Sequence, residues 1–588
     1  MKDFIKSVCA TIVGLLAFFI IAGALSLMSI VGMVASSQST QSVPDNSVLV
    51  IKLDGALQEA ATDNLYDKIN GTTTNGLAET LDAISKAKDS KAVKGIYLEA
   101  GSLGADMAQA QELRDALADF KTAHKWIVAY GEQYSLGAYY VATVADKLYL
   151  NPQGMVDWQG LGGQMMFVKD ALAKIGVKMV PFKCGKYKSA TEMFTEERMS
   201  EPNRQQTERY IGGWWQTVCQ AVAKSRGISP DSLQAYADRV ISLEDPKNLV
   251  KYKMVDGLLY NDQVKGVVSS RLGLGKSDQV AQVSVADLNA APSKTEGDQI
   301  AVYYAWGDIV QDRPAQGAFS NAHLIVGREM CKDLQDLADN DDVKAVVIRI
   351  NSGGGSAYAS EQIWHQIEAL RTKKPVVVSM GGAAASGGYY ISAAADYIVA
   401  EPTTITGSIG IFGLQLDKSK LLTEKLGLRY DEVKTNRNAT MGGAMSPMTA
   451  EQMGLMQASV NRGYALFKSR VARGRRLNMQ QVEERAQGHV FLGTDALKLH
   501  LVDELGGLDK AVAKAGKLAK LDKHYTVSYP APENWMDQLL DVGSYKGTAL
   551  DEQLRLTLGS FYEPVMMLRT VEQLDPLQAR CPFIITNL

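Results

Sequence analysis

The sequence predicts an α/β protein that contains two tandem copies of one domain, and three observations support this fold class. The segments VKGIYLEAGSLG, from Val93, and VKAVVIRINSGG, from Val343, are similar, and their start positions differ by 250. A second pair of similar segments, from Ala138 and Gly388, has the same offset of 250. Each copy also alternates short β-rich runs with a helical segment, which indicates a largely parallel sheet.

Each copy contains three runs that are typical of strands. They are NSVLVIKLDG, GIYLEA and WIVAY in the first copy, and QIAVYYAWGD, AVVIRI and VVVSM in the second. β-Branched and aromatic residues dominate these runs, as expected for strands of a buried sheet. A helical segment lies between the second and third run of each copy, so the order of elements indicates an α/β domain.

The repeat and the composition divide the chain into five parts. At 588 residues the chain exceeds the length at which one hydrophobic core stops growing, which is ~250–300 residues. We therefore expect two globular domains with appendages. Residues 1–45 form a cytoplasmic stub, a transmembrane signal anchor and a tether, and residues 46–268 form a first repeat that supplies a lysine to the candidate site. A linker (269–299) leads to a second repeat that supplies a serine to the same site (300–520), and a helical tail follows (521–588).

The N-terminus has the features of a retained membrane anchor. Lys2 and Lys6 precede an uncharged apolar stretch, residues 7–35. A spanning helix needs ~20 such residues, whereas the apolar core of a cleaved signal peptide has ~7–15. The alternative to a retained anchor is a signal peptide that is cleaved near residues 34–36. The lysines before the span predict a cytoplasmic N-terminus, which leaves the rest of the chain outside.

Composition and charge exclude several classes of protein. Hydrophobic residues make up 46% of the chain and charged residues 22%, so most of it folds in water. The net charge of -3 and the lack of a basic stripe argue against a nucleic-acid partner. The five cysteines and six histidines are scattered without metal-ligand spacing. We therefore expect no metal, no cofactor and no disulfide framework, and we expect any hydrolysis to proceed without histidine.

The two copies differ at a serine after the third strand. The second copy reads GGAAASGGYY and the first reads GEQYSLGAYY, so Leu136 occupies the position of Ser386. A serine between small residues at a strand–helix junction is a suitable nucleophile, and the N–H of Gly387 could then point at a reacting carbonyl. The same run would also allow close packing at the start of a helix, so this motif alone leaves both interpretations open.

A glycine cluster follows the second strand of the second copy only. Residues 351–356 read NSGGGS, whereas residues 101–106 read GSLGAD. Glycines let the backbone turn sharply and bring N–H groups close to a ligand, so Gly354 is a candidate for a second oxyanion donor. A phosphate-binding loop is the competing interpretation, but no GxxxxGK[ST] pattern follows.

The first copy carries a lysine that the second copy lacks. Its segment KCGKYKSA contains Lys188, and the related segment of the second copy, KTNRNA, has no lysine at that position. The copy with the serine lacks the lysine, and the copy with the lysine lacks the serine, as expected if the two copies together build one composite site. A lysine becomes a base near neutral pH when burial lowers its pKa from ~10.4 to ~7–8. Taken alone, Lys188 would be interpreted as a solvated surface residue.

These motifs together resemble the SppA family of signal peptide peptidases, of the protease IV type, in its long two-repeat form. The resemblance covers nearly the entire chain and includes KYKSATEMFTEERMS, AASGGYYISAAADYIVAEP and TGSIGIFG. It implies two tandem ClpP/crotonase-like spiral ββα domains with an N-terminal transmembrane helix.

The resemblance also implies roles for individual residues. Ser386 matches the nucleophile of the family, Lys188 its general base, and Ser408 the serine that orients the lysine. The counterpart of Ser408 at the offset of 250 is Trp158. The glycine loop departs from the family pattern Ser-Pro-Gly-Gly, because Gly353 replaces the proline. The oxyanion assignments of Gly354 and Gly387 therefore have less support than the Ser/Lys dyad.

The activity implied by the resemblance is that of a membrane-anchored serine endopeptidase that degrades cleaved signal peptides through an acyl-enzyme. The resemblance further implies a homotetramer in the bacterial inner (cytoplasmic) membrane, with its catalytic domains on the periplasmic side and membrane-associated peptides as partners. Two alternatives are a crotonase-like acyl-CoA enzyme, which shares the fold and the glycine-built oxyanion hole, and an inert membrane scaffold.

Overall fold

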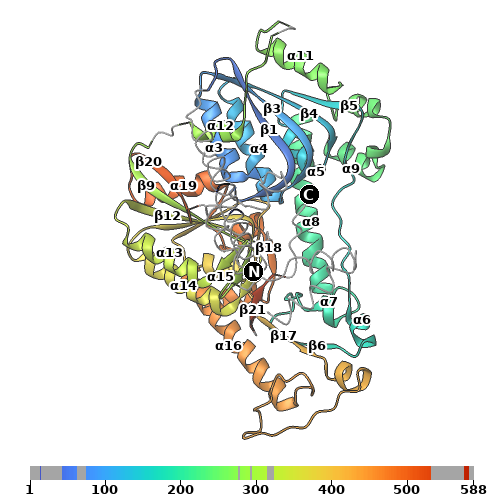
Figure 1. Cartoon of the computed structure of the whole chain (residues 1–588), viewed down its shortest axis with the longest axis vertical. Coiled ribbons are helices and arrows are strands. Elements are labelled where there is room, and N and C mark those ends of the chain that lie inside the picture. The colour runs from blue at the N-terminus through green and yellow to red at the C-terminus, as the bar shows by residue number, and fades with distance from the viewer. Residues whose placement is uncertain are drawn as a thin grey trace, which may run out of the picture.

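Two largely parallel sheets, one per repeat, form the centre of the molecule, with the first repeat above the second in Figure 1. The computed structural model describes residues 14, 21, 43–61, 75–275, 278–291, 295–313, 323–531, 575 and 577–581. The predicted anchor, residues 7–35, lies outside the described residues except for positions 14 and 21. Within the described ranges, no helix is long and apolar enough to cross a membrane.

The first sheet has seven strands, and all of its strand pairs are parallel. The strand order is β2-β1-β3-β4-β5-β7, and β8 also pairs with β1. The strands are β1 (Ser47–Gln58), β2 (Asn75–Gly76), β3 (Val93–Gly104), β4 (Trp126–Tyr134), β5 (Lys147–Val156), β7 (Gly257–Leu258) and β8 (Gln282–Val283). Helices α3 (Leu77–Asp89), α4 (Met107–Lys121) and α5 (Leu136–Ala142) pack with them.

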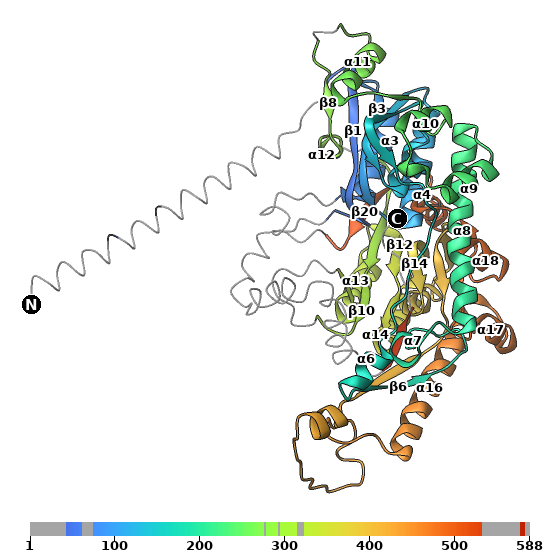
Figure 2. The ribbon, with the colours of Figure 1, turned by 90° about the vertical axis from the view of Figure 1, so that its right-hand side faces the viewer.

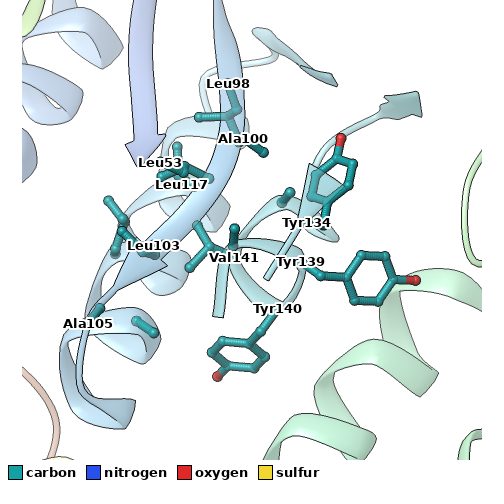
Figure 3. Close-up of a cluster of buried hydrophobic side chains, with 14 of the residues drawn as sticks. Leu53, Leu98, Ala100, Leu103, Ala105, Leu117, Tyr134, Tyr139, Tyr140 and Val141 are labelled. Carbon is teal, nitrogen blue, oxygen red and sulfur yellow. The ribbon is translucent and has the colours of Figure 1, made fainter. Parts of the chain in front are cut away.

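Apolar side chains from these strands and helices fill the core of the first repeat. Figure 3 shows Leu103 of β3 near Val141 of α5, with Tyr139 and Tyr140 of the same helix beside them. All of these side chains are buried. Helix α4 begins where Asp106 and Gln109 form a capping box, which fixes the turn out of β3.

The second sheet has eight strands and repeats the same plan. The order is β18-β16-β14-β12-β9-β20, with β15 paired to β14 and β19, and only the β16–β18 pair is antiparallel. The strands are β9 (Asp298–Trp306), β12 (Val343–Ser352), β14 (Val376–Ala385), β15 (Tyr397–Ala400), β16 (Ile405–Gly407), β18 (Val490–Leu492), β19 (Glu504–Leu505) and β20 (His524–Tyr529). The helices that match α3, α4 and α5 are α13 (Gly327–Asp339), α14 (Ala357–Arg371) and α15 (Gly387–Ser392).

The element boundaries confirm the internal repeat. Helix α3 begins at residue 77 and α13 at residue 327, while α4 begins at residue 107 and α14 at residue 357. Both pairs therefore have the offset of 250 found in the sequence. The last positions of the two pairs have the same offset. The six runs predicted as strands lie in β1, β3, β4, β9, β12 and β14, with the end of the fourth run extending into β10. The prediction of a largely parallel α/β fold is therefore confirmed.

A third sheet joins segments that are far apart in the sequence. Its order is β11-β10-β13-β21-β17-β6. Strand β6 comes from the first repeat and pairs antiparallel with β17 of the second, over Phe412↔Lys183 to Asp417↔Lys178. The strands are β6 (Lys178–Lys183), β10 (Asp308–Val310), β11 (Leu324–Val326), β13 (Gly354–Ser356), β17 (Phe412–Asp417) and β21 (Gln578–Arg580).

The remaining helices cover the sides of the two repeats. The long helix α8 runs beside both of them (Figures 1 and 2), and its Trp214 indole N–H donates to the carbonyl of Thr403 at 2.8 Å. The helices are α6 (Lys169–Lys174), α7 (Glu192–Thr195), α8 (Glu201–Arg226), α9 (Pro230–Asp238), α10 (Pro246–Lys251), α11 (Asn261–Arg271), α12 (Val285–Ala290), α16 (Ala450–Arg475), α17 (Met479–Arg485), α18 (Gly493–Lys498) and α19 (Leu508–Leu518), with short helical turns at Ile241–Leu243 and Leu421–Lys425.

Two segments differ from what the sequence led us to expect. The predicted linker, residues 269–299, contains β8 and α12, which contact β1 and α3 of the first repeat. The prediction of a helical tail for residues 521–588 is wrong where the structure describes it, because residues 524–529 and 578–580 are strands. The run HYTVSY is rich in β-forming residues and extends the second sheet beside β9.

Candidate active site

Ser386 lies between the end of β14 and the start of α15, where the backbone is strained. Its φ of 54° and ψ of −111° place a non-glycine residue in a sparsely populated region. Its N–H donates to the Gly407 carbonyl at 2.8 Å, and its hydroxyl does not cap the helix. This sharp strand-to-helix turn leaves the Ser386 hydroxyl available to another group.

That group is the amine of Lys188. Its Nζ donates to Ser386 Oγ at 2.7 Å, to Ser408 Oγ at 3.0 Å and to the Ser408 carbonyl at 3.1 Å. These contacts account for the three donors that an ammonium group can offer. All three side chains are fully buried, with exposed fractions of 0%. The structure thus brings together Ser386 and Lys188, predicted from the complementary losses in the two repeats, and Ser408, whose place the family resemblance implied.

Burial lowers the pKa of Lys188 to about 7, and a weaker opposing effect comes from the nearby Cys581. Removing an ammonium group from water disfavours its charged form, and the three oxygens that its Nζ contacts belong to neutral groups. A neutral amine beside a serine hydroxyl can accept the hydroxyl proton. The arrangement therefore has the chemical requirements of a nucleophile and its base.

Two glycines make room for the lysine side chain. A Cβ on Gly488 would lie 2.7 Å from Lys188 Cβ, and a Cβ on Gly410 would lie 3.2 Å from Lys188 Cδ. Gly410 belongs to the TGSIG run, but nothing in that run indicates that it faces the lysine. The sequence alone does not identify Gly488 as a neighbour of Lys188, because Gly488 lies far from Lys188 in the chain and no local pattern marks it.

A buried polar cluster supports the loop that carries Lys188. The Glu192 carboxylate accepts from Asn203 Nδ2 at 2.9 Å and from Ser200 Oγ at 2.6 Å. Gln206 Nε2 donates to the Tyr187 carbonyl at 3.2 Å, while its Oε1 accepts from the Val490 N–H at 3.3 Å. These bonds tie the loop to α8 and to β18 of the second repeat. They explain how a polar segment, KYKSATEMFTEERMS, can bury several of its side chains.

The two predicted oxyanion glycines lie next to each other. A Cβ on Gly354 would be 2.6 Å from the Gly387 nitrogen. Gly354 has a φ of +100°, which favours glycine, and its N–H donates to Ser352 Oγ at 3.1 Å. The glycine loop is therefore beside the serine, and the donor roles of Gly354 and Gly387 stay predictions.

A buried ion-pair cluster joins the two repeats. Arg349 of β12 contacts Glu59 and Glu112 of the first repeat, each at 2.7 Å, and it also donates to Ser379 Oγ at 3.1 Å. Arg349 is 1% exposed, so its charge is balanced by these carboxylates rather than by water.

Asn351 connects this cluster to the strand of the serine. Its Nδ2 donates to Glu59 at 2.6 Å and to Asp106 at 2.8 Å, both in the first repeat. Its Oδ1 accepts from the N–H of Ala383 in β14 at 3.0 Å. Burial, with the neighbouring Glu59, raises the pKa of Asp106 to about 6. No sequence pattern marks this cluster, because its members are ordinary polar and charged residues far apart in the chain.

Comparison with known proteins identifies the family. A family model described as peptidase family S49 matches residues 119–273 and again residues 368–522, together more than half of the chain. The chain belongs to peptidase family S49. A second model, described as Clp protease, matches residues 321–404. The S49 domain is thus present twice in tandem, as the constant offset between the two copies predicted.

Curated relatives of this S49 chain are serine proteases of the SppA type. It is 36% identical to "Protease 4" of Salmonella typhi over 478 residues, which cover 79% of this chain and 76% of the relative. It is 33% identical to "Protease 4" of Haemophilus influenzae, over 84% of this chain and 82% of the relative. It is 29% identical to the chloroplastic "Serine protease SPPA" of Arabidopsis thaliana, over 82% and 70%. The resemblance to the SppA family is confirmed, and the S49 chain is a serine protease.

Two solved protease structures match a smaller part of this chain. A variant of ClpP1 from Listeria monocytogenes has a TM-score of 0.24 and 16% identity, and the match covers 36% of this chain and 94% of that one. A variant of 1510-N, a membrane-bound stomatin-specific protease, also has a TM-score of 0.24 and 16% identity, over 37% and 85%.

Proposed function

We propose that this S49 protease uses Ser386 as its nucleophile and Lys188 as its general base. The observation that carries the proposal is the 2.7 Å contact between Lys188 Nζ and Ser386 Oγ in a site that both repeats build. The lowered pKa of Lys188, about 7, supports a base that is partly neutral at physiological pH.

The reaction begins when neutral Lys188 takes the proton of the Ser386 hydroxyl. The alkoxide attacks the carbonyl carbon of the scissile peptide bond, and the bond breaks as Lys188 returns the proton to the leaving amine. Lys188 then activates a water molecule that releases the acyl group from Ser386. Ser408 keeps the amine in line through its hydroxyl and its carbonyl, which accept from Nζ at 3.0 and 3.1 Å.

The negative charge on the tetrahedral intermediate needs donors that are already in place. We assign this role to the N–H groups of Gly354 and Gly387, which are neighbours beside Ser386. Removing one such donor typically slows an acyl-transfer enzyme by ~10²–10³-fold. The Ser352 hydroxyl, which accepts from the Gly354 N–H, would have to yield that donor to the substrate.

The substrate and the location are part of the same proposal. The apolar stretch of residues 7–35 supports a single-pass anchor in the bacterial inner membrane, with both repeats on the periplasmic side. Such an enzyme would meet cleaved signal peptides and other membrane-associated peptides as they leave the bilayer. Its relatives are proteases of the SppA type, and we propose that these peptides are the substrates of this chain and that it forms a homotetramer.

The decisive experiment is the replacement Ser386→Ala in the full chain. We expect complete loss of peptide hydrolysis and of labelling by a serine-reactive fluorophosphonate probe, with an unchanged melting temperature. The matched control is Ser392→Ala, because Ser392 is also a fully buried serine but its hydroxyl donates to the Gly388 carbonyl within α15. Activity or labelling that survives in Ser386→Ala would show that another residue is the nucleophile.

A further inference from the structure

Glu401 places a buried carboxyl group where the two repeats meet. It follows β15 directly and begins the turn of residues 401–404 that leads into β16. Glu401 is 2% exposed, and among the described residues none donates a hydrogen bond to its carboxyl. A buried carboxylate normally has such a donor or a cation beside it. The surroundings of Glu401 therefore suit a neutral, protonated carboxyl.

A second carboxyl group, that of Glu112 in α4, faces Glu401 from the first repeat. A Cβ placed on Gly507 would lie 2.5 Å from Glu112 Oε1 and 2.9 Å from Glu401 Oε1, so these two oxygens are neighbours. Glu112 already accepts from Arg349 at 2.7 Å and from the Leu508 N–H at 2.5 Å. These contacts stabilise the ionised form of Glu112, so a charge on Glu401 would meet a carboxylate of the other repeat.

The two cations that face Glu401 are engaged with other groups. Arg349 is shared between Glu59 and Glu112, and the Lys510 amine donates to a backbone carbonyl at 2.7 Å. Burial and, after it, the Glu112 carboxylate raise the pKa of Glu401 to about 8. The charged and titratable groups around Glu401 are Glu112 and Asp115 of α4, Tyr140 of α5, Arg349 of β12 and Lys510 of α19.

The first repeat shows that this turn does not require a carboxyl group. At the offset of 250, Asn151 matches Glu401 and Gln362 matches Glu112, so both counterparts are neutral amides. Asn151 Nδ2 donates to the Tyr130 hydroxyl at 3.2 Å, within its own repeat. The facing pair of carboxyl groups therefore belongs to the contact between the repeats and not to the fold of either one.

The turn that begins at Glu401 is held against the first repeat. Its two ends are joined by the Thr404 N–H, which donates to the Glu401 carbonyl at 3.0 Å. The Thr403 hydroxyl donates to Gln111 Oε1 of α4 at 2.8 Å, and the Thr403 carbonyl accepts from the indole N–H of Trp214 in α8 at 2.8 Å. Repulsion between Glu401 and α4 would therefore act on a turn that both helices hold in place.

Strand β16 connects this turn to the catalytic pair. The Gly407 carbonyl, at the end of β16, accepts from the Ser386 N–H at 2.8 Å. The next residue, Ser408, accepts from the Lys188 amine through its hydroxyl and its carbonyl. A displacement of the turn would therefore pull on one contact of the proposed nucleophile and on two contacts of the proposed base.

We propose that Glu401 is a pH-dependent clasp between the repeats: its neutral form lets the turn rest against α4, and its ionised form repels the turn from α4 and draws Gly407 and Ser408 away from the catalytic pair. The proton passes to the solvent, and the change is reversible. The inference rests on the proposed function, because it takes Ser386 and Lys188 as the groups that the turn positions. Ionisation of Glu401 switches the enzyme off in alkaline solution, whereas protonation of Lys188 switches it off in acid.

The first test is the pH dependence of peptide hydrolysis by the full chain and by its Glu401→Gln variant. With only the neutral form active, kcat/KM of the natural chain should fall at least about tenfold between pH 8 and pH 9.5, because the pKa of Glu401 is about 8. Glutamine has no proton to lose, so Glu401→Gln should keep most of its pH 8 activity at pH 9.5. Equal alkaline limbs in the two proteins would overturn the proposal.

The matched control is Glu504→Gln in the neighbouring strand β19. Glu504 is half-buried, and its carboxylate accepts from the Tyr397 hydroxyl at 3.3 Å and lies 4.0 Å from the Lys510 amine. We expect this variant to keep the alkaline limb of the natural chain. Loss of the limb in both variants would mean that any lost negative charge has this effect, which would also overturn the proposal.

Melting temperatures test the same group without catalysis. Folding raises the pKa of Glu401 from its ordinary value of 4.5 to about 8, so the folded state favours the protonated form. The stability that this proton contributes is complete below pH 4.5 and is lost as the pH rises through 8. The melting temperature of Glu401→Gln relative to the natural chain should therefore rise between pH 5 and pH 8 and level off above about pH 9. A difference that is independent of pH would rule out a titrating clasp.

The fluorescence of Trp214 reports on the turn itself, since its indole bonds to Thr403. We would measure it in the Ser386→Ala chain, as the difference from the same chain with Trp214→Phe. The emission should shift between pH 7 and pH 9.5, and the added change Glu401→Gln should abolish the shift. Emission that does not respond to pH would mean that the turn stays in place, against the proposal.

This last measurement separates the clasp from the proposed function. Movement of the turn needs no catalysis, so the shift should persist in Ser386→Ala. If Ser386→Ala still hydrolysed peptides, the catalytic assignment would fail, whereas the emission and the melting temperatures would report on Glu401 alone.

Discussion

The two repeats use one scaffold in opposite ways at the start of their matching helices. In the first repeat Ser135 has an ordinary extended backbone and caps α5 through Ala138 N–H, and Leu136 is buried in the core. In the second repeat Ser386 takes the position of Leu136 with a φ of 54°, and its hydroxyl bonds to Lys188. The unusual backbone is therefore not needed by the fold, because the first copy forms the same strand and helix without it.

The same contrast holds at Ser408 and its counterpart Trp158. The indole of Trp158 is fully buried, packs edge-on against Tyr139 with ring centroids 5.7 Å apart, and donates to the Leu233 carbonyl. Figure 3 shows this part of the first repeat filled with apolar and aromatic side chains, Tyr139 among them. The second repeat keeps a polar site in the corresponding region, and that site requires the burial of an amine. Leu136 and Trp158 are core residues that stabilise the fold of the first repeat, whereas we propose a chemical role for Ser386 and Ser408 at the matching positions.

After Ser386→Ala, the largest effect should come from Lys188→Met, which turns the proposed base into an apolar side chain of similar length. We expect peptide hydrolysis to fall by about 10²–10⁴-fold, the usual contribution of general acid–base catalysis. Lys186→Met, two positions away in the same loop but exposed, should keep full activity. Equal activity of the two variants would remove Lys188 from the mechanism.

The Lys188→Met variant should also be the more stable protein, and the gain should depend on pH. The folded chain holds Lys188 at a pKa of about 7, well below its ordinary value of 10.5, so folding favours the neutral form. The folded state therefore bears its full penalty at pH 7 and below, and the penalty fades as the pH rises toward 10.5. Melting curves of both proteins should differ most at pH 6 and converge near pH 10; a constant difference would contradict a buried, titrating lysine.

The next largest effect concerns the ion pairs between the repeats, which we compare at two positions. Arg349→Met removes a 1% exposed guanidinium from two carboxylates, and the unpaired buried charges should cost about 3–5 kcal/mol of unfolding free energy. Arg209→Met removes another pair between the repeats, with Asp495, but Arg209 is 63% exposed, and the cost should stay below about 1 kcal/mol. Urea denaturation of both variants measures the difference, and similar losses would contradict the role of burial.

Most of the scaffold could be predicted from the sequence because its signals are local and occur twice. The strands β3 and β12, for example, are short apolar runs at a constant offset, and the contrast between Leu136 and Ser386 follows from aligning the two copies. The pairing of β6 with β17 and the position of β21 could not be predicted. The strands with which β6 and β21 pair lie in distant parts of the chain. Pairing between two distant strands leaves no pattern in the sequence of either strand.

The smallest effect should come from Ser408→Ala, which tests how far the second repeat holds the lysine of the first. Lys188 would keep its bonds to Ser386 and to the position 408 carbonyl but lose one acceptor, so we expect kcat to fall by roughly 10–100-fold with little change in KM. Loss of an acceptor disfavours the charged amine, so the acid limb of kcat/KM, expected near pH 7 in the natural chain, should move to lower pH. Ser408→Thr keeps the hydroxyl and should restore both the rate and the limb. A Ser408→Ala enzyme with reduced rate but an unshifted limb would mean that Ser408 shapes the site without contacting the base.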